Sequence, residues 1–161
     1  MISPAARDAL QGWLDAQKAL KGASDNTLEA YGRDVAGFLT FITQHNAEAQ
    51  GVAALARVGV SDMRAWMAFT RGEDVGARSL ARKLSAVKSF YRWLSEREGF
   101  DATAVLSARA PKFQRKLPRP LAPDAAQNLI DTLDMQSETP WVAARDQAVV
   151  TLLYGCGLRI S

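Results

Sequence analysis

One predicted helix, over residues 77–98, carries a face of arginine and serine side chains that could bind the phosphates of a nucleic acid. At 100° per residue, the three arginines of this face lie within about 80° of one another, opposite the apolar residues. Small serines between them would let the helix approach a groove closely while arginines reach phosphates or base edges. We call this set the basic face: Arg78, Arg82, Ser85, Ser89 and Arg92.

The alternative interpretation is an ordinary solvated helix face. That alternative predicts mixed charges, with acids and lysines four residues apart. The basic face has no acid before Glu96, and charges of one sign repel one another. The pattern therefore favours a polyanionic partner.

The positive charge of the whole chain is concentrated around that helix. The 161 residues carry a net charge of +3, yet residues 76–122 alone carry +8, from 11 lysines and arginines against 3 acids. Residues 1–75 carry −2 and residues 123–161 carry −3. Such a concentration is the electrostatic footprint of a nucleic-acid-binding surface, although a solvating linker would share it.

Residue types for other chemistry are scarce. Cys156 is the single cysteine, which excludes a disulfide framework and a multi-cysteine metal site, and we expect it to be a small packed side chain. His45 is the single histidine and is expected at the surface near a helix end. Tyr31, Tyr91 and Tyr154 each fall on an apolar helical face, which argues against a nucleophilic role for any of them.

Composition favours a globular protein, with 48% apolar and 23% charged residues. No apolar run approaches the roughly 18–20 residues of a membrane span. The first 20 residues lack the apolar centre of a signal peptide. We therefore expect a cytoplasmic protein with no membrane partner.

Apolar residues recur at helical spacing throughout, and no period-2 strand pattern is convincing, so we expect an all-α fold. Residues 47–59 are expected to form a loop with one turn of helix at most. Ser3, Asn26 and Ser61 are the expected N-caps of the first three helices. The expected helices span residues 4–20, 26–46, 61–72, 77–98, 124–133 and 140–154.

A change of composition marks a boundary after the basic helix. Residues 100–123 contain four prolines and five basic residues, and three of the prolines fall within six positions. Repeated prolines exclude a helix and favour a stiff, extended chain. We expect a linker between two domains there.

Four segments, in this order along the chain, resemble Xer-type tyrosine recombinases of the phage integrase family. Residues 26–34 and 77–94 resemble the second and the last long helix of the core-binding domain in that family, and residues 110–118 resemble its interdomain linker. Residues 144–161 resemble the opening of its catalytic domain, and their Leu-Arg-Ile-Ser ending is the most specific of the four motifs.

The resemblance implies an organisation and an activity. Residues 1–107 would be a four-helix, SAM-like core-binding domain, residues 108–122 a basic proline-rich linker, and residues 123–161 the start of a catalytic domain. Enzymes of this family cut and rejoin DNA at paired sites through a 3′-phosphotyrosyl intermediate, with no metal or nucleotide cofactor. Arg159 matches the first arginine of their catalytic set.

The resemblance also implies the DNA contacts. The second and fourth helices would face the major groove of a double-stranded recombination half-site, and the linker would follow the backbone. The implied contacts are Thr27, Arg33, Arg78, Ser79, Arg82, Ser85, Lys88 and Arg92 on the helices, with Lys112, Arg115 and Lys116 in the linker.

The implied partners are a second, related recombinase subunit in a tetrameric synapse and a DNA translocase. The remaining catalytic residues, the tyrosine included, would follow Ser161, so we expect the chain to be a fragment that does not cleave DNA. Chromosome-dimer resolution is the favoured role, and integration of a mobile element is the alternative. Two other classes stay open: a non-catalytic helical DNA-binding regulator, and a helical scaffold for an acidic protein.

Overall fold

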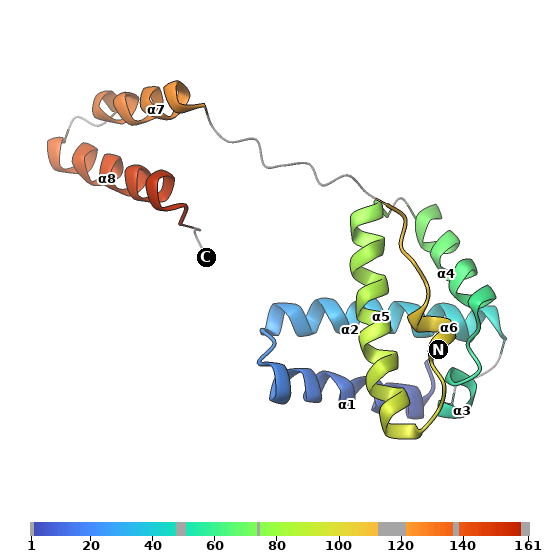
Figure 1. Ribbon diagram of the computed structural model, residues 1–161. Helices are drawn as coiled ribbons and strands as arrows, with labels where there is room; N and C mark the ends of the chain where they lie inside the picture. The colour runs from blue at the N-terminus through green and yellow to red at the C-terminus, as the bar shows by residue number, and fades with distance from the viewer. Residues whose placement is uncertain (1, 48–50, 74, 113–121, 137–138, 159–161) are drawn as a thin grey trace. The chain divides into compact units, whose positions relative to one another are not determined.

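The computed structural model describes residues 2–47, 51–73, 75–112, 122–136 and 139–158 (Figure 1). All regular secondary structure in those ranges is helical, so the prediction of an all-α chain is confirmed for them. The chain divides into two compact units, residues 1–114 and 115–161.

Helix α1 (Pro4–Lys21) begins and ends as the sequence predicts. Ser3 is its N-cap, because the Ser3 Oγ accepts a hydrogen bond from the Ala6 N–H at 3.2 Å. The helix ends at Gly22, whose φ of 59° lies in the left-handed region that glycine adopts without strain.

Helix α2 (Asp25–His45) begins before its predicted cap. Asn26 lies inside the first turn, so its prediction as N-cap is wrong. Ser24 takes that position in an extended conformation, and its Oγ accepts a hydrogen bond from the Thr27 N–H at 3.4 Å. Serine and asparagine cap helices about equally well, so the sequence could not separate two candidates two residues apart.

Helices α3 (Val52–Leu55) and α4 (Val60–Gly72) follow. The single turn of α3 agrees with the prediction for this region. The predicted cap Ser61 is wrong, because the N-cap of α4 is Gly59. The Gly59 N–H donates to Asp62 Oδ2 at 2.8 Å, so the carboxylate at the third helical position supplies the capping bond that Gly59 has no side chain to make.

Helix α5 (Ala77–Glu98) has the predicted bounds and ends at Gly99, whose φ is 73°. The short helix α6 (Thr103–Leu106) lies within residues 100–123, so the prediction that this segment excludes a helix is wrong for its first part, because its prolines begin only at Pro111. Its start is stabilised by Asp101, whose Oδ1 accepts hydrogen bonds from the Thr103 N–H and hydroxyl. Its Val105 is buried, so this segment adds to the core before the proline-rich region begins.

The core of the first unit lies where α5 packs against both α1 and α2 (Figure 1). Adjacent residues of α5 face inward: Phe90 meets Trp13 of α1 with ring centroids 5.7 Å apart, and Tyr91 meets Phe38 of α2 at 5.9 Å. Phe38 also meets Trp66 of α4 at 5.1 Å. The largest fully buried side chains are Trp13, Tyr91, Phe38, Phe90, Leu39, Ile42, Leu55, Met63, Leu80, Leu94 and Val35.

The second unit consists of α7 (Pro123–Gln136) and α8 (Pro140–Cys156), which pack on each other. Among its described side chains only Ala126 and Ala143 are buried. None of the helices in the described ranges combines the length and the apolarity that crossing a bilayer requires.

Candidate nucleic-acid interface

The basic face of α5 lies on the outside of the first unit. Its arginines and Ser85 are exposed, as is the neighbouring Ser79, and Ser89 is half-buried. The apolar stripe of the same helix is buried in the core, as predicted. The packing of α5 on α1 and α2 therefore presents the basic face to solvent over about four helical turns.

Asp34 of α2 is an acid that sequence reasoning missed at this surface. Its side chain is only 2% exposed and pairs with the guanidinium of Arg82, whose side chain is 48% exposed. Arg82 Nη1 donates to Asp34 Oδ2, and Arg82 Nη2 donates to Asp34 Oδ1 at 3.2 Å. An acid one position before Val35 and four before Phe38, within the apolar stripe of α2, was the available signal of a buried ion pair.

The electrostatics of Asp34 combine burial with a group of cations. Burial raises the pKa of the Asp34 carboxyl above its ordinary value of 3.8, and the attraction of Arg82, Lys83 and Arg33 offsets only part of that rise. Three cations thus act on one buried carboxyl group at the contact of α2 with α5. The surface there keeps an excess of positive charge.

The two predicted contacts on α2 already have partners within that helix or its cap. The Thr27 hydroxyl lies 2.9 Å from the Ser24 hydroxyl at the helix N-terminus. Arg33 Nη2 donates to Glu29 Oε1 at 2.7 Å, with both side chains well exposed. Exposed ion pairs of this kind contribute little to stability, so Arg33 could exchange Glu29 for a phosphate at small cost.

A second concentration of cations lies further along α5. Lys88 is half-buried, and its pKa is lowered first by burial and then by the charges of Arg92 and Arg109. Arg109 follows α6 and was not among the predicted DNA contacts. Its only signal in the sequence was its place in the basic segment 100–123. The fold brings Arg109 within electrostatic reach of Lys88.

Three predicted site residues lie outside the described residues: Arg115, Lys116 and Arg159. Lys112 is exposed.

The tyrosines occupy different environments. Tyr91 is buried, and its hydroxyl donates to the Leu55 carbonyl oxygen at 3.2 Å. Tyr31 is half-buried and stacks on Trp13 with ring centroids 5.7 Å apart. Tyr154 of α8 is exposed. Tyr31 and Tyr91 thus serve the packing of the first unit.

The single histidine lies as predicted, in the last turn of α2 and exposed to solvent. His45 stacks on Phe41 and its Nε2 lies 3.6 Å from Asp62 Oδ1. The prediction of a packed side chain at Cys156 is wrong, because this cysteine is exposed. It is the last residue of α8, and the contact of α8 with α7 leaves it in solvent.

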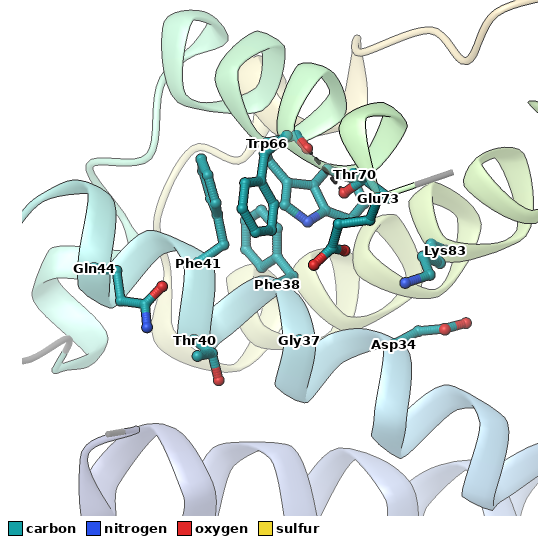
Figure 2. Close-up of a pocket in the computed structure, with 11 residues that line it drawn as sticks. Asp34, Gly37, Phe38, Thr40, Phe41, Gln44, Trp66, Thr70, Glu73 and Lys83 are labelled. Atoms are coloured by element: carbon teal, nitrogen blue, oxygen red, sulfur yellow. Dashed lines mark hydrogen bonds between the residues drawn. The ribbon is translucent and has the colours of Figure 1, made fainter. Parts of the chain in front are cut away.

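A pocket of about 330 Å³ lies next to the Asp34 ion pair, between α2 and α4 (Figure 2). Aromatic side chains form much of its wall, including Phe38 and Trp66. Gln44 lies at one end, and Asp34 and Lys83 lie at the other (Figure 2). One end of this pocket is thus formed by two residues of the charged group that surrounds Arg82.

Comparisons with known proteins agree with the geometry of the first unit. The family model for the phage integrase N-terminal SAM-like domain matches residues 10–98, from within α1 to the last residue of α5. That range contains the whole basic face and Asp34.

Curated relatives extend the similarity along the chain. The tyrosine recombinase XerC of Brucella suis biovar 1 (strain 1330) is 41% identical over 153 residues, which are 95% of this chain and 49% of the relative. XerC of Rhodospirillum centenum is 41% identical over 158 residues, which are 98% of this chain and 46% of the relative. XerC of Methylobacterium nodulans is 45% identical over 162 aligned residues, which cover 98% of this chain and 49% of the relative.

The chain thus spans about half the length of the curated relatives it matches. The family match itself covers more than half of the 161 residues and includes the helices that pack and present the basic face. By this match, the chain belongs to the family of phage integrase N-terminal SAM-like domains.

Proposed function

We propose that this chain is the DNA-binding part of a site-specific tyrosine recombinase, which cuts and rejoins DNA through a 3′-phosphotyrosyl intermediate. The observation that carries the proposal is the exposed basic face of α5 inside the range that matches the family. An exposed helix face whose charged side chains are all positive is suited to bind the phosphates and base edges of a DNA duplex.

The proposed division of labour follows the chain. Residues 1–107 form the core-binding domain, with α2 and α5 toward the major groove. Residues 108–122 are the linker that follows the DNA backbone through Lys112, Arg115 and Lys116. Residues 123–161 begin the catalytic domain, and Arg159 is the first arginine of its phosphate-binding set.

The proposed chemistry explains why arginines are needed. The tyrosine oxygen attacks the scissile phosphorus, the 5′ oxygen of the next nucleotide leaves with a proton, and a 3′-phosphotyrosyl bond forms. Negative charge spreads over the phosphate oxygens in the transition state, where fixed cations such as Arg159 stabilise it. The covalent bond conserves the energy that rejoining needs.

The similarity to XerC proteins supports a role in chromosome-dimer resolution, in the cytoplasm, where the chromosome lies. The proposed partners are a double-stranded recombination half-site, a second, XerD-like subunit in a tetrameric synapse, and a DNA translocase. Integration of a mobile element would use the same chemistry on a different pair of sites.

The test is a titration of the 161-residue chain with a fluorescent duplex carrying a Xer-type half-site, and with a scrambled duplex, at several salt concentrations. About six phosphate contacts predict a slope of log K against log salt near −5, and one isolated domain predicts a dissociation constant of about 10⁻⁴–10⁻⁶ M. The double variant Arg78→Ala, Arg92→Ala should reduce that slope by about 2.

A matched control removes the same charge from α4. The double variant Arg64→Ala, Arg71→Ala should bind the duplex nearly as the unmodified chain does, because these exposed arginines lie outside the basic face. Equal losses for the two double variants, or no salt-sensitive binding at low salt, would refute the proposed interface.

The chain by itself is expected to bind DNA without cutting it, because only Arg159 of the family's catalytic set matches this sequence. A suicide substrate that traps the 3′-phosphotyrosyl intermediate checks this. A covalent protein–DNA product from the 161-residue chain would contradict the expectation.

A further inference from the structure

Arg82 differs from the other arginines of the basic face, because a buried carboxylate holds it. Asp34 accepts one hydrogen bond from each terminal nitrogen of the Arg82 guanidinium. The carboxylate belongs to α2 and the arginine to α5, 48 positions later. The pair therefore fixes the guanidinium relative to both helices that would face the DNA.

The pair uses only one edge of the guanidinium. A guanidinium has five N–H donors, and the end-on pair uses one on each terminal nitrogen. The side edge, with the Nε–H and one further N–H, has the geometry of a second fork that can bind a phosphate with two parallel hydrogen bonds. The Arg82 side chain remains 48% exposed in the pair, so part of it can be reached from solvent.

The surroundings supply the charge that a phosphate needs. Arg33 and Lys83 also act electrostatically on Asp34, so three cations surround one carboxylate. Glu29 pairs with Arg33, so these three cations face two acids and the group keeps a net charge of +1. A free arginine would have to lose side-chain freedom on binding DNA, and Arg82 has already lost it in the unbound protein.

We propose that Asp34 is a positioning residue for DNA binding: through the Arg82–Asp34 pair it holds the guanidinium so that its open edge grips one backbone phosphate. The proposal rests on the proposed function, and it gives a role in DNA binding to Asp34, whose own negative charge repels DNA. The sign of its effect is therefore diagnostic. Removing a carboxylate should strengthen DNA binding by electrostatics alone, whereas loss of positioning weakens it.

The test compares Asp34→Asn with Glu29→Gln in the fluorescent half-site titration. Both changes remove one negative charge from α2 and one arginine partner, but the Arg33–Glu29 pair is exposed whereas Asp34 is buried. Asp34→Asn should bind about three- to tenfold more weakly than the unmodified chain. Glu29→Gln should bind equally or more tightly. Tighter binding by Asp34→Asn would overturn the proposal, because Asp34 would then compete with DNA for Arg82.

A double-mutant cycle separates positioning from general damage to the fold. In an Arg82→Ala background, Asp34→Asn should cause no further weakening, because the guanidinium it positions is gone. An equal loss in both backgrounds would overturn the proposal. The scrambled duplex should show the same loss as the half-site, since a phosphate carries no sequence information, and a loss confined to the half-site would overturn the phosphate assignment.

Circular dichroism shows whether Asp34→Asn folds. If it does not, a second variant tests the same proposal. Arg82→Lys keeps the charge but cannot form two forks in one plane, so it should lose the same three- to tenfold. Unchanged affinity for this variant would show that only the charge matters. Failure of the proposed function is recognised separately, because the Arg78→Ala, Arg92→Ala double variant would then leave binding unchanged.

Discussion

The two units of the chain differ in how much of their apolar surface they bury. In residues 1–114, side chains from α1, α2, α4 and α5 meet in one continuous core of large aromatic and aliphatic residues. In the described part of the second unit only two alanines are buried, while Trp141, Leu152 and Leu158 are more than half exposed. The first unit thus completes its own core, and α7 with α8 does not.

The reason lies in how the apolar residues are distributed around each helix. α5 has a narrow apolar stripe opposite the basic face, which the neighbouring helices cover. α8 carries apolar side chains around much of its circumference, and one partner helix cannot cover them all. Helices that are apolar all round belong to the interior of larger folds. The stability of the folded chain is therefore expected to come mainly from the first unit.

The largest expected effect is on the core at Phe38. This fully buried ring contacts Trp66 and Tyr91, so Phe38→Ala should lower the free energy of unfolding by about 3–5 kcal/mol. Trp141→Ala in α8 is the control, since its side chain is 65% exposed, and should change stability by less than about 0.5 kcal/mol. Urea unfolding followed by circular dichroism measures both. Similar losses of unfolding free energy in the two variants would contradict the conclusion that only the first unit has a complete core.

The next effect concerns the hydrogen bond from the Tyr91 hydroxyl to the Leu55 carbonyl oxygen, which is buried and 3.2 Å long. Tyr91→Phe keeps the ring and removes the donor, so it should cost about 0.5–1.5 kcal/mol of stability. Tyr154→Phe makes the same change on exposed α8 and should cost nothing measurable in the same unfolding assay. A neutral Tyr91→Phe would mean that water replaces the lost donor.

A gain in stability is expected from a substitution at Gly37, in the middle of α2. A Cβ added there would meet no atom within 4 Å, so alanine fits without displacing a neighbour. Gly37→Ala should raise the unfolding free energy by roughly 0.5–1 kcal/mol, because alanine loses less backbone freedom in a helix. Gly155→Ala on α8 is equally unhindered and should leave the main unfolding transition in place. If Gly155→Ala shifted that transition, the result would show that the two units unfold together.

The smallest effect is a pH dependence from Asp34. Its pKa is higher in the folded chain than the ordinary 3.8, so the folded chain binds this proton more tightly than the unfolded chain does. The resulting stabilisation is fully present below the unfolded pKa and is lost as the pH rises through the folded pKa. The unmodified chain should therefore gain stability relative to Asp34→Asn as the pH falls through that range. Parallel pH profiles for the two proteins would argue against a raised pKa.

Most of the first unit could be predicted from the sequence because its helices are long and strongly periodic. The bounds of α5 and its buried stripe follow from residues recurring every three or four positions. The caps of α2 and α4 were misplaced because several capping residues stand within a few positions of each helix start. The helix α6 was missed because four residues are too few to show a period.

The candidate site could be predicted only in part. Charge patterning indicated the basic face, since the residues of one helix face are fixed by their spacing. The Arg82–Asp34 pair could not be derived in the same way, because it joins residues 48 positions apart and depends on how α2 and α5 pack. The approach of Arg109 to Lys88 likewise depends on the path of the chain after α5. Exposure of Cys156 depends on which face of α8 meets α7.

The lowered pKa of Lys88 has a thermodynamic consequence for the protein without DNA. Holding this half-buried charge near Arg92 and Arg109 works against the folded state. An anion that neutralises the group relieves the repulsion and, because it prefers the folded chain, shifts the folding equilibrium by mass action. On the proposed function, DNA binding would also stabilise the folded domain, and a polyanion such as heparin should raise its melting temperature.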